Sequence, residues 1–242
     1  MRNLIEQLEA AILYEGEGGA TRNMGKLSLA QAREYANGVI EAKMKKPLDE
    51  VIPDFDANYL RVQQAVKSAK GVSRDQMPVV EPGDTAEFSK RLTSGRIDLF
   101  KPYLNGKLKR IKGQQKPMDK GDSEVFLTAG YKDGVKADDK IAAKITKMPA
   151  SKMKPIQSQI WLEKVIDNIA KFGVPGPGSP VAKTTIIVSK DGQIIDGHHR
   201  WAQAALAAPD LAMTVLKVPL TIDELLDLAR TYGAAIGRGF KA

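Results

Sequence analysis

Residues 186–202, IIVSKDGQIIDGHHRWA, decide the fold of this chain. The apolar run 186–188 consists of β-branched residues and predicts a short strand. Asp191-Gly192 is a strong hairpin turn signal, because glycine adopts positive φ angles freely. The run 193–195 continues as a second strand, so the segment predicts a β-hairpin.

An abrupt entry into a helix follows this hairpin. Asp196-Gly197 breaks the second strand, and the alanine-rich run that comes after it predicts the helix. Both histidines of the chain, His198 and His199, lie at this junction beside Arg200. Free backbone N–H groups, the positive end of the helix dipole and side-chain donors converge here, which indicates a phosphate-binding site. The alternative is a solvated helix start in which Asp196 is only the N-cap.

Composition narrows the class of protein. The chain has 242 residues, 43% of them hydrophobic, which suffices for one large domain or two small ones. It contains no cysteine, which excludes disulfides, thiolate metal sites and a cysteine nucleophile. No apolar run reaches the roughly 18 residues of a membrane span, so we expect no membrane partner. The charged N-terminus lacks the apolar core of a signal peptide, and we expect a cytoplasmic protein.

The chain is strongly basic. Its formal net charge is +8 and its pI is near 9.4, which favours a polyanionic partner such as DNA or RNA, or a phosphorylated ligand. The densest basic run contains Lys107, Lys109, Arg110 and Lys112. We predict that this run contacts the phosphate backbone of nucleic acid. The alternative is a solvated loop, which is the commoner use of such charge runs.

The sequence divides into three predicted regions. Residues 1–100 are predicted to be a helical N-terminal region, in which Ser28 caps the second helix and Asp56 the third. Such helices usually serve packing or oligomerisation, so we predict a homo-oligomer that forms through them. Residues 101–139 are a predicted basic, loop-rich linker, with a short strand at 125–127.

Residues 140–242 are predicted to form the main α/β domain. A strand within 141–148, the hairpin and a strand at 215–218 supply a small mixed sheet. Two further helices flank these strands, one ending at Gly173 and the last ending at Gly233. Thr221 and Glu224 form a capping box for the last helix. The predicted fold class is therefore α/β (α+β), with helices of the N-terminal region packed on the domain or extending from it.

Two short boxes stand out in this domain. Residues 154–157, KPIQ, precede its first helix, and residues 196–200, DGHHR, open the helix after the hairpin. A strand that ends in Val218-Pro219-Leu220 follows. Over residues 140–233 this order resembles the ParB/sulfiredoxin superfamily. Members share a Pro-x-Gln or Pro-x-Glu box before the first helix and a Gly-x-x-Arg box at the second. Stand-alone domains of this kind are similar to proteins carried by bacteriophages.

The resemblance implies a nucleotide site. The second box holds nucleotide phosphates in the family, so the predicted ligands of the phosphates are Gly197, His198, His199 and Arg200. Gln157 and Gln159 are predicted to approach from the first box as neutral hydrogen-bonding groups. The implied cofactor is a nucleoside triphosphate, CTP or ATP, with Mg²⁺.

The same junction supplies the predicted catalytic groups, which are Asp196, His198 and His199. Asp196 orients a histidine, caps the helix, or holds Mg²⁺ that bridges to the phosphate. A histidine with a pKa near neutrality would gain a proton when a phosphate binds, because the added negative charge favours the cation.

Departures from the family narrow the activity. Sulfiredoxins have a cysteine where this chain has His198, which excludes repair of sulfinic acids. ParB partition proteins carry Glu-Arg-Arg where this chain has His-His-Arg. The free serine kinase branch has a glutamate base in the first box, whereas Gln157 cannot accept a proton. Kinase chemistry therefore requires Glu163 or Asp167 as a substitute base.

Three functions follow from these observations. The first is a nucleotide hydrolase or nuclease that acts with nucleic acid, which the DGHHR box and the net charge favour. The second is a small-molecule kinase of the free amino acid type, which the box alone favours. The third is a non-enzymatic phage structural protein that retains the fold, which the helical N-terminal region favours.

Overall fold

A four-stranded sheet forms the middle layer of the molecule. The computed structural model describes residues 22–78, 80, 82–97, 120–128, 130 and 139–237. The strand order is β1-β4-β2-β3, with the bounds Lys144–Pro149 for β1, Ile186–Val188 for β2, Ile194–Asp196 for β3 and Ala212–Lys217 for β4. β2 and β4 run parallel, whereas the two outer pairs are antiparallel. The predicted α/β class, the mixed sheet and the hairpin are confirmed.

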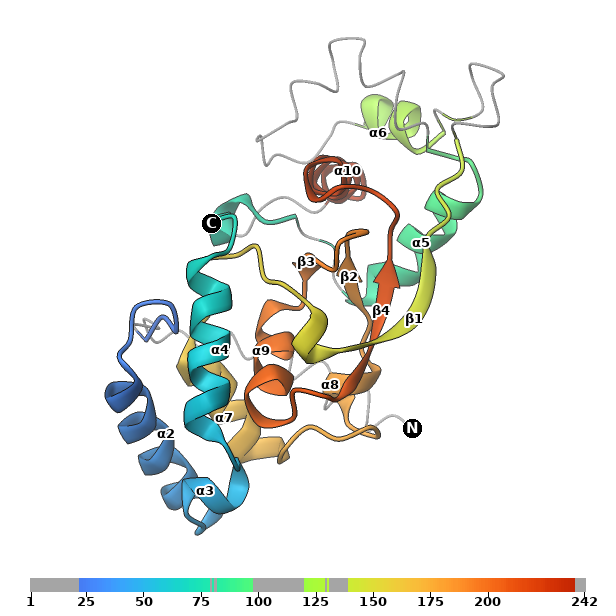
Figure 1. Cartoon of the computed structure of the whole chain (residues 1–242). Helices are drawn as coiled ribbons and strands as arrows, with labels where there is room; N and C mark the ends of the chain where they lie inside the picture. The colour runs from blue at the N-terminus through green and yellow to red at the C-terminus, as the bar shows by residue number, and fades with distance from the viewer. Residues whose placement is uncertain are drawn as a thin grey trace.

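Helices cover both faces of the sheet (Figure 1). Alternate strand residues point to opposite faces, and Ile186 and Val188 accordingly join one core while Ile187 joins the other. The first core is completed by α2 (Leu29–Met44), α4 (Phe55–Lys67), α7 (Leu162–Phe172) and α9 (His198–Ala207). The second is completed by α5 (Thr85–Thr93), α6 (Lys120–Leu127) and α10 (Ile222–Ala235).

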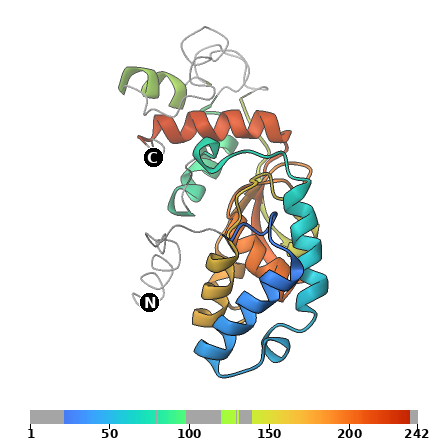
Figure 2. The same cartoon turned by 90° about the vertical axis from the view of Figure 1, so that its left-hand side faces the viewer.

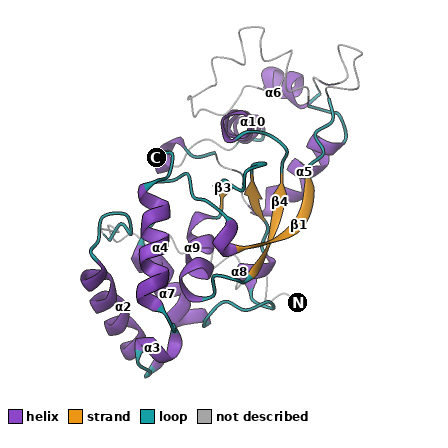
Figure 3. Ribbon diagram, viewed as in Figure 1, coloured by secondary structure: helices purple, strands orange, loops and turns teal. Residues whose placement is uncertain are grey.

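The layers are seen most clearly from the side. In Figure 2, α10 lies across one end of the described structure, and α2, α4 and α7 lie at the other end. Figure 3 shows the orange strands between these two groups of helices. The described residues also form short elements, which are α3 (Leu48–Val51), α8 (Pro180–Lys183) and the 3-10 turns η1 (Arg74–Gln76), η2 (Pro82–Asp84) and η6 (Ala150–Lys152).

Local sequence signals set several helix ends. Ser28 caps α2 and accepts a hydrogen bond from the Gln31 N–H, as predicted. Thr221 and Glu224 form the predicted capping box of α10. α7 ends at Gly173, whose φ of 83° is costly for any residue with a Cβ.

Three sequence-based predictions of local structure were wrong. Residues 125–127 belong to the helix α6, because Phe126 is buried in the core that α6 shares with α10. A three-residue apolar run alone cannot separate strand from helix. α4 begins at Phe55 after an Asp54 N-cap, and the Asp56 carboxylate pairs instead with Arg33 at 2.6 Å. α10 runs through Gly233, which is buried, because packing outweighs the low helix propensity of glycine.

The N-terminal helices share a core with the C-terminal elements. α2 packs on α7 and α4 packs on α9. The Asn58 side chain of α4 donates a buried 3.0 Å hydrogen bond to the Leu206 carbonyl of α9. The proposed division into residues 1–100, 101–139 and 140–242 remains a prediction. Within the described residues, no helix has both the length and the apolarity needed to cross a membrane.

Candidate functional site

The N-terminus of α9 is the centre of the candidate site. Gly197 is its N-cap and has φ 92°, a left-handed conformation that lets strand β3 turn directly into the helix. The first helical hydrogen bond runs from the Trp201 N–H to the Gly197 carbonyl at 2.8 Å. The N–H groups before Trp201 therefore have no acceptor within the helix. α9 has no acidic residue in its first turn, so its positive end is not neutralised there.

His198 is a buried, neutral hydrogen-bond acceptor. Its Nε2 accepts the Ile156 N–H at 3.2 Å and the Gln157 N–H at 3.3 Å. Burial lowers the pKa of His198 to about 3, and the charge of Arg200 contributes to this shift. The His198 ring thus connects the two boxes. Its pKa is so low that the ring is not protonated near neutral pH.

His199 is likewise a neutral hydrogen-bond acceptor, but its partner lies further along the 156–161 segment. Its Nε2 accepts the Trp161 N–H at 3.1 Å, just before α7. Burial, together with the charges of Lys164 and Arg74 and a contribution from His198, lowers the pKa of His199 to about 3. Neither ring therefore has the near-neutral pKa that proton uptake on phosphate binding would require. The surrounding cations instead make this corner of the site electropositive.

Arg200 and Asp196 form an ion pair across Gly197. Arg200 Nη2 lies 2.6 Å from Asp196 Oδ2, and Nη1 donates to the carbonyls of Thr184 and Thr185 at 3.2 and 3.3 Å. The N-cap of α9 is Gly197, so Asp196 is not the cap. Arg200 thus supports the fold around β2. The contact of Arg200 with phosphate remains a prediction. Such a contact would have to use the N–H groups of Arg200 that do not take part in these bonds.

The first box reaches α9 through its backbone, and the Gln159 side chain just after it reaches η1. Gln157 is buried, and its N–H contacts His198. Gln159 Oε1 accepts the Arg74 N–H at 3.2 Å, which brings η1 to the site. Gln157 therefore lies beside His198 of the second box, Gln159 contacts η1, and the contact of both glutamines with a nucleotide remains a prediction.

Lys164 and Arg74 are the cations that the sequence analysis missed. Lys164 lies in the first turn of α7 and is half-buried. Burial lowers its pKa, and the charge of Arg74 lowers it further. Among the described residues, no acceptor pairs with the Lys164 ammonium. The sequence could have indicated Lys164, because Lys164 lies in the helix that follows the first box. Nothing in the sequence indicates that Arg74 lies near this box.

The two carboxylates considered as substitute kinase bases pair with residues of the N-terminal region. Glu163 Oε1 accepts the Arg22 N–H at 2.8 Å, and Asp167 Oδ1 pairs with Lys43 of α2 at 2.8 Å. Both side chains thus join α7 to the N-terminal region, and Asp167 does so directly to α2.

The described residues contain no group of three or more His, Asp or Glu side chains arranged to hold a metal ion. Asp196 is the predicted Mg²⁺ ligand, and its Oδ2 is paired with Arg200. Mg²⁺ bound with a nucleotide takes most of its ligands from phosphate oxygens and water. Asp196 fits such an ion as a single additional ligand at most.

The predicted nucleic-acid contacts Lys107, Lys109, Arg110 and Lys112 lie outside the described residues, so this prediction remains open. Comparison with known proteins found no matching family model, no matching curated protein and no matching solved structure.

Proposed function

We propose that this chain binds the phosphate groups of a nucleoside triphosphate at the N-terminus of α9. The class is then a ParB-like nucleotide-binding protein, a nucleotide hydrolase or nuclease that acts with nucleic acid. The resemblance of the KPIQ and DGHHR boxes to the ParB/sulfiredoxin superfamily supports this class, and so does the net charge of +8.

One observation carries the proposal: half-buried Lys164, which pairs with no acceptor among the described residues, acts by its charge on His199 at a helix start that has no acidic residue in its first turn. Burying a cation without a partner costs free energy, and the lowered pKa of Lys164 reflects that cost. A bound phosphate would supply the missing charge. It would also accept hydrogen bonds from the free N–H groups of α9.

The neutral rings of His198 and His199 have a distinct role in this proposal. They hold the 156–161 segment against α9 and so orient the groups that contact the phosphate. Mg²⁺ would neutralise part of the charge of the triphosphate, with Asp196 as its one ligand from the box.

Lys164→Gln tests the proposal, with Lys171→Gln near the other end of α7 as the matched control. Loss of a charged hydrogen bond of about 1.5 kcal/mol predicts roughly tenfold weaker binding for Lys164→Gln. Lys171→Gln should bind as the wild type does. The measurement is calorimetric titration with CTP, ATP and ADP in the presence of Mg²⁺. Phosphate release with and without DNA then separates hydrolysis from simple binding.

Absence of binding by the wild type, or equal loss in both variants, would contradict the proposal. Transfer of phosphate to a small acceptor would favour the kinase alternative. Lys164 is preferable to Arg200 for this test, because Arg200 also holds backbone carbonyls and its removal would disturb the fold.

A second candidate is a non-enzymatic structural protein, and a specific observation favours it. Four consecutive side chains of α9 bind other parts of the same chain: His198 and His199 bind the 156–161 segment, Arg200 binds residues 184–185, and Trp201 Nε1 donates to the Ala150 carbonyl at 2.9 Å. The DGHHR box would then serve as a structural clasp, and the titrations would show no binding.

A further inference from the structure

Residues 70–76, here called the strap, cross between the two boxes and α10. On one side the strap is hydrogen-bonded to the first box. The Val72 N–H donates to the Ile156 carbonyl at 3.0 Å, and the Val72 carbonyl accepts the Ser158 N–H at 3.4 Å. The Arg74 N–H adds the contact with Gln159. The middle of the strap is thus attached to the same segment that His198 and His199 hold.

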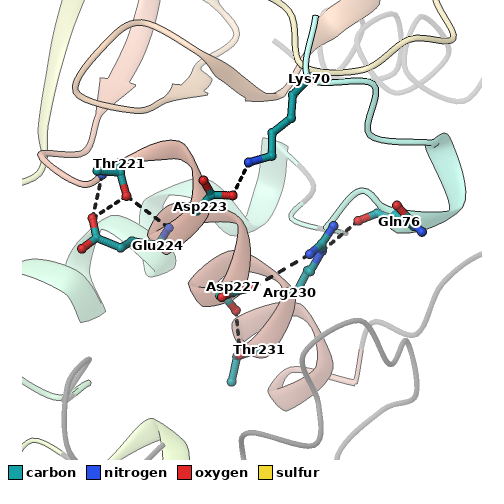
Figure 4. A network of polar contacts seen from close by, with 8 residues as sticks. All are labelled: Lys70, Gln76, Thr221, Asp223, Glu224, Asp227, Arg230 and Thr231. Atoms are coloured by element: carbon teal, nitrogen blue, oxygen red, sulfur yellow. Dashed lines mark hydrogen bonds and ion pairs between the residues drawn. The ribbon is translucent and has the colours of Figure 1, made fainter.

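On its other side the strap is attached to α10 at both ends (Figure 4). Lys70 at the start of the strap forms an ion pair with Asp223. Arg230 Nε donates to the Gln76 carbonyl at 2.8 Å at the end of the strap. The Arg230 side chain is only 15% exposed, so this contact is largely shielded from water.

A cavity lies between the strap and α10. Its volume is about 260 Å³, and its lining includes Val72, Leu226 and Arg230. Val72 of the strap and Leu226 of α10 both belong to the second core, and polar contacts attach the strap to α10 at its two ends. Loss of either contact therefore frees one end of the strap to move.

We propose that α10 positions Arg74 beside the N-terminus of α9, with Arg230 and Asp223 as the positioning residues. Arg74 lies between Val72, which is attached to the first box, and Gln76, which is attached to Arg230. The Arg74 backbone, which donates to Gln159, is therefore held through the attachment of the strap to α10, and the Arg74 charge acts on Lys164 and His199. The effect on ligand affinity rests on the proposed phosphate-binding function.

A double-mutant cycle between Arg230→Gln and Arg74→Gln tests this inference. The probe is inorganic tripolyphosphate, which carries the charge of a nucleotide without its base. If Arg230 acts through Arg74, Arg230→Gln should weaken binding about 3- to 10-fold in the wild-type background and have no effect in the Arg74→Gln background. Arg230→Lys should restore much of the affinity, because lysine can still donate to the Gln76 carbonyl.

The control is Lys46→Gln, which removes an exposed ion pair with Glu50 beside α3. This variant should leave tripolyphosphate affinity unchanged. Equal weakening by Arg230→Gln in both backgrounds, or weakening by Lys46→Gln, would overturn the positioning role.

Amide hydrogen exchange supplies a readout that does not depend on a ligand. Arg230→Gln should speed exchange at the Val72 and Arg74 amides and leave the amides of α2 unchanged. If exchange is faster in Arg230→Gln but the wild type does not bind tripolyphosphate, the phosphate site is refuted. The role of Arg230 in positioning the strap is then still supported. Unchanged exchange at both amides would overturn the inference.

Discussion

The two histidines of the box differ from ordinary histidines in their pKa. Each ring accepts backbone N–H groups through Nε2, and an accepting nitrogen cannot be protonated without losing those bonds. Both rings are therefore structural acceptors at neutral pH. Positive charge at the candidate site comes instead from Lys164 and Arg74. Both charges contribute to the lowered pKa of His199, and the Arg74 charge contributes to the lowered pKa of Lys164.

The low pKa of His198 predicts acid sensitivity. The folded-state pKa is about 3, below the ordinary value of 6.5, so the unfolded chain binds more protons between these two pH values. The free energy of unfolding should therefore be greatest above pH 6.5 and fall as the pH is lowered towards 3. One proton per molecule corresponds to a slope of about 1.4 kcal/mol per pH unit.

The measurement is urea unfolding of the wild type and His198→Asn from pH 7.5 to 5, above the range in which most carboxylates titrate. Asn keeps an acceptor for the Ile156 and Gln157 N–H groups but does not titrate. We expect a shallower dependence on pH in the variant, with His199 responsible for the remainder. The same slope in both proteins would show that His198 is not the sensitive group.

At the scale of the element, α9 depends on the conformation of its N-cap. A Cβ at Gly197 would lie 2.9 Å from both Ile186 Cγ1 and Arg200 Nη2, and the φ of 92° is unfavourable for alanine. The glycine therefore permits both the sharp turn and the Asp196–Arg200 ion pair that crosses over it.

Gly197→Ala should lower the free energy of unfolding by about 1–3 kcal/mol, since it adds backbone strain and a close contact. Gly178→Ala is the matched control, because nothing lies within 4 Å of a Cβ there and its φ is not positive. Chemical denaturation of the two variants checks the difference. Equal stability of both variants would mean that the β3–α9 junction adapts to a side chain.

At the scale of the molecule, the sheet separates two cores that contain helices from distant parts of the chain. α2 and α4 complete the core in which α7 and α9 lie, and the Asn58 hydrogen bond joins α4 to α9 at a buried position. The described helices of the N-terminal region therefore contribute to the stability of the elements that form the candidate site.

Asn58→Ala tests whether these helices unfold together with α9. Loss of the bond leaves the Leu206 carbonyl without this partner and should cost about 1–3 kcal/mol. Far-UV circular dichroism should report all helices, and tryptophan fluorescence should report buried Trp201 of α9 together with Trp161 at the start of α7. We expect one coincident urea transition for both signals, shifted to lower urea in the variant. Separate transitions, with fluorescence unaffected by the substitution, would contradict a shared cooperative unit.

Much of the fold and part of the site could be predicted from local sequence. Asp191-Gly192 determines the hairpin because glycine permits the turn, and Ser28 and Thr221 begin helices because their hydroxyls accept free N–H groups. Gly197 likewise marks the junction at which the site lies. These signals act within a few residues, so no knowledge of packing is needed to interpret them.

The tertiary structure alone decided the partners of the box. The sequence shows two histidines and an arginine but not that they bind backbone groups 15 to 42 residues away. It also cannot show that the Arg74 backbone contacts Gln159, or that residues 125–127 become helical against α10. Such contacts join segments whose distance in space depends on the packing of the whole core, and no local preference encodes that distance.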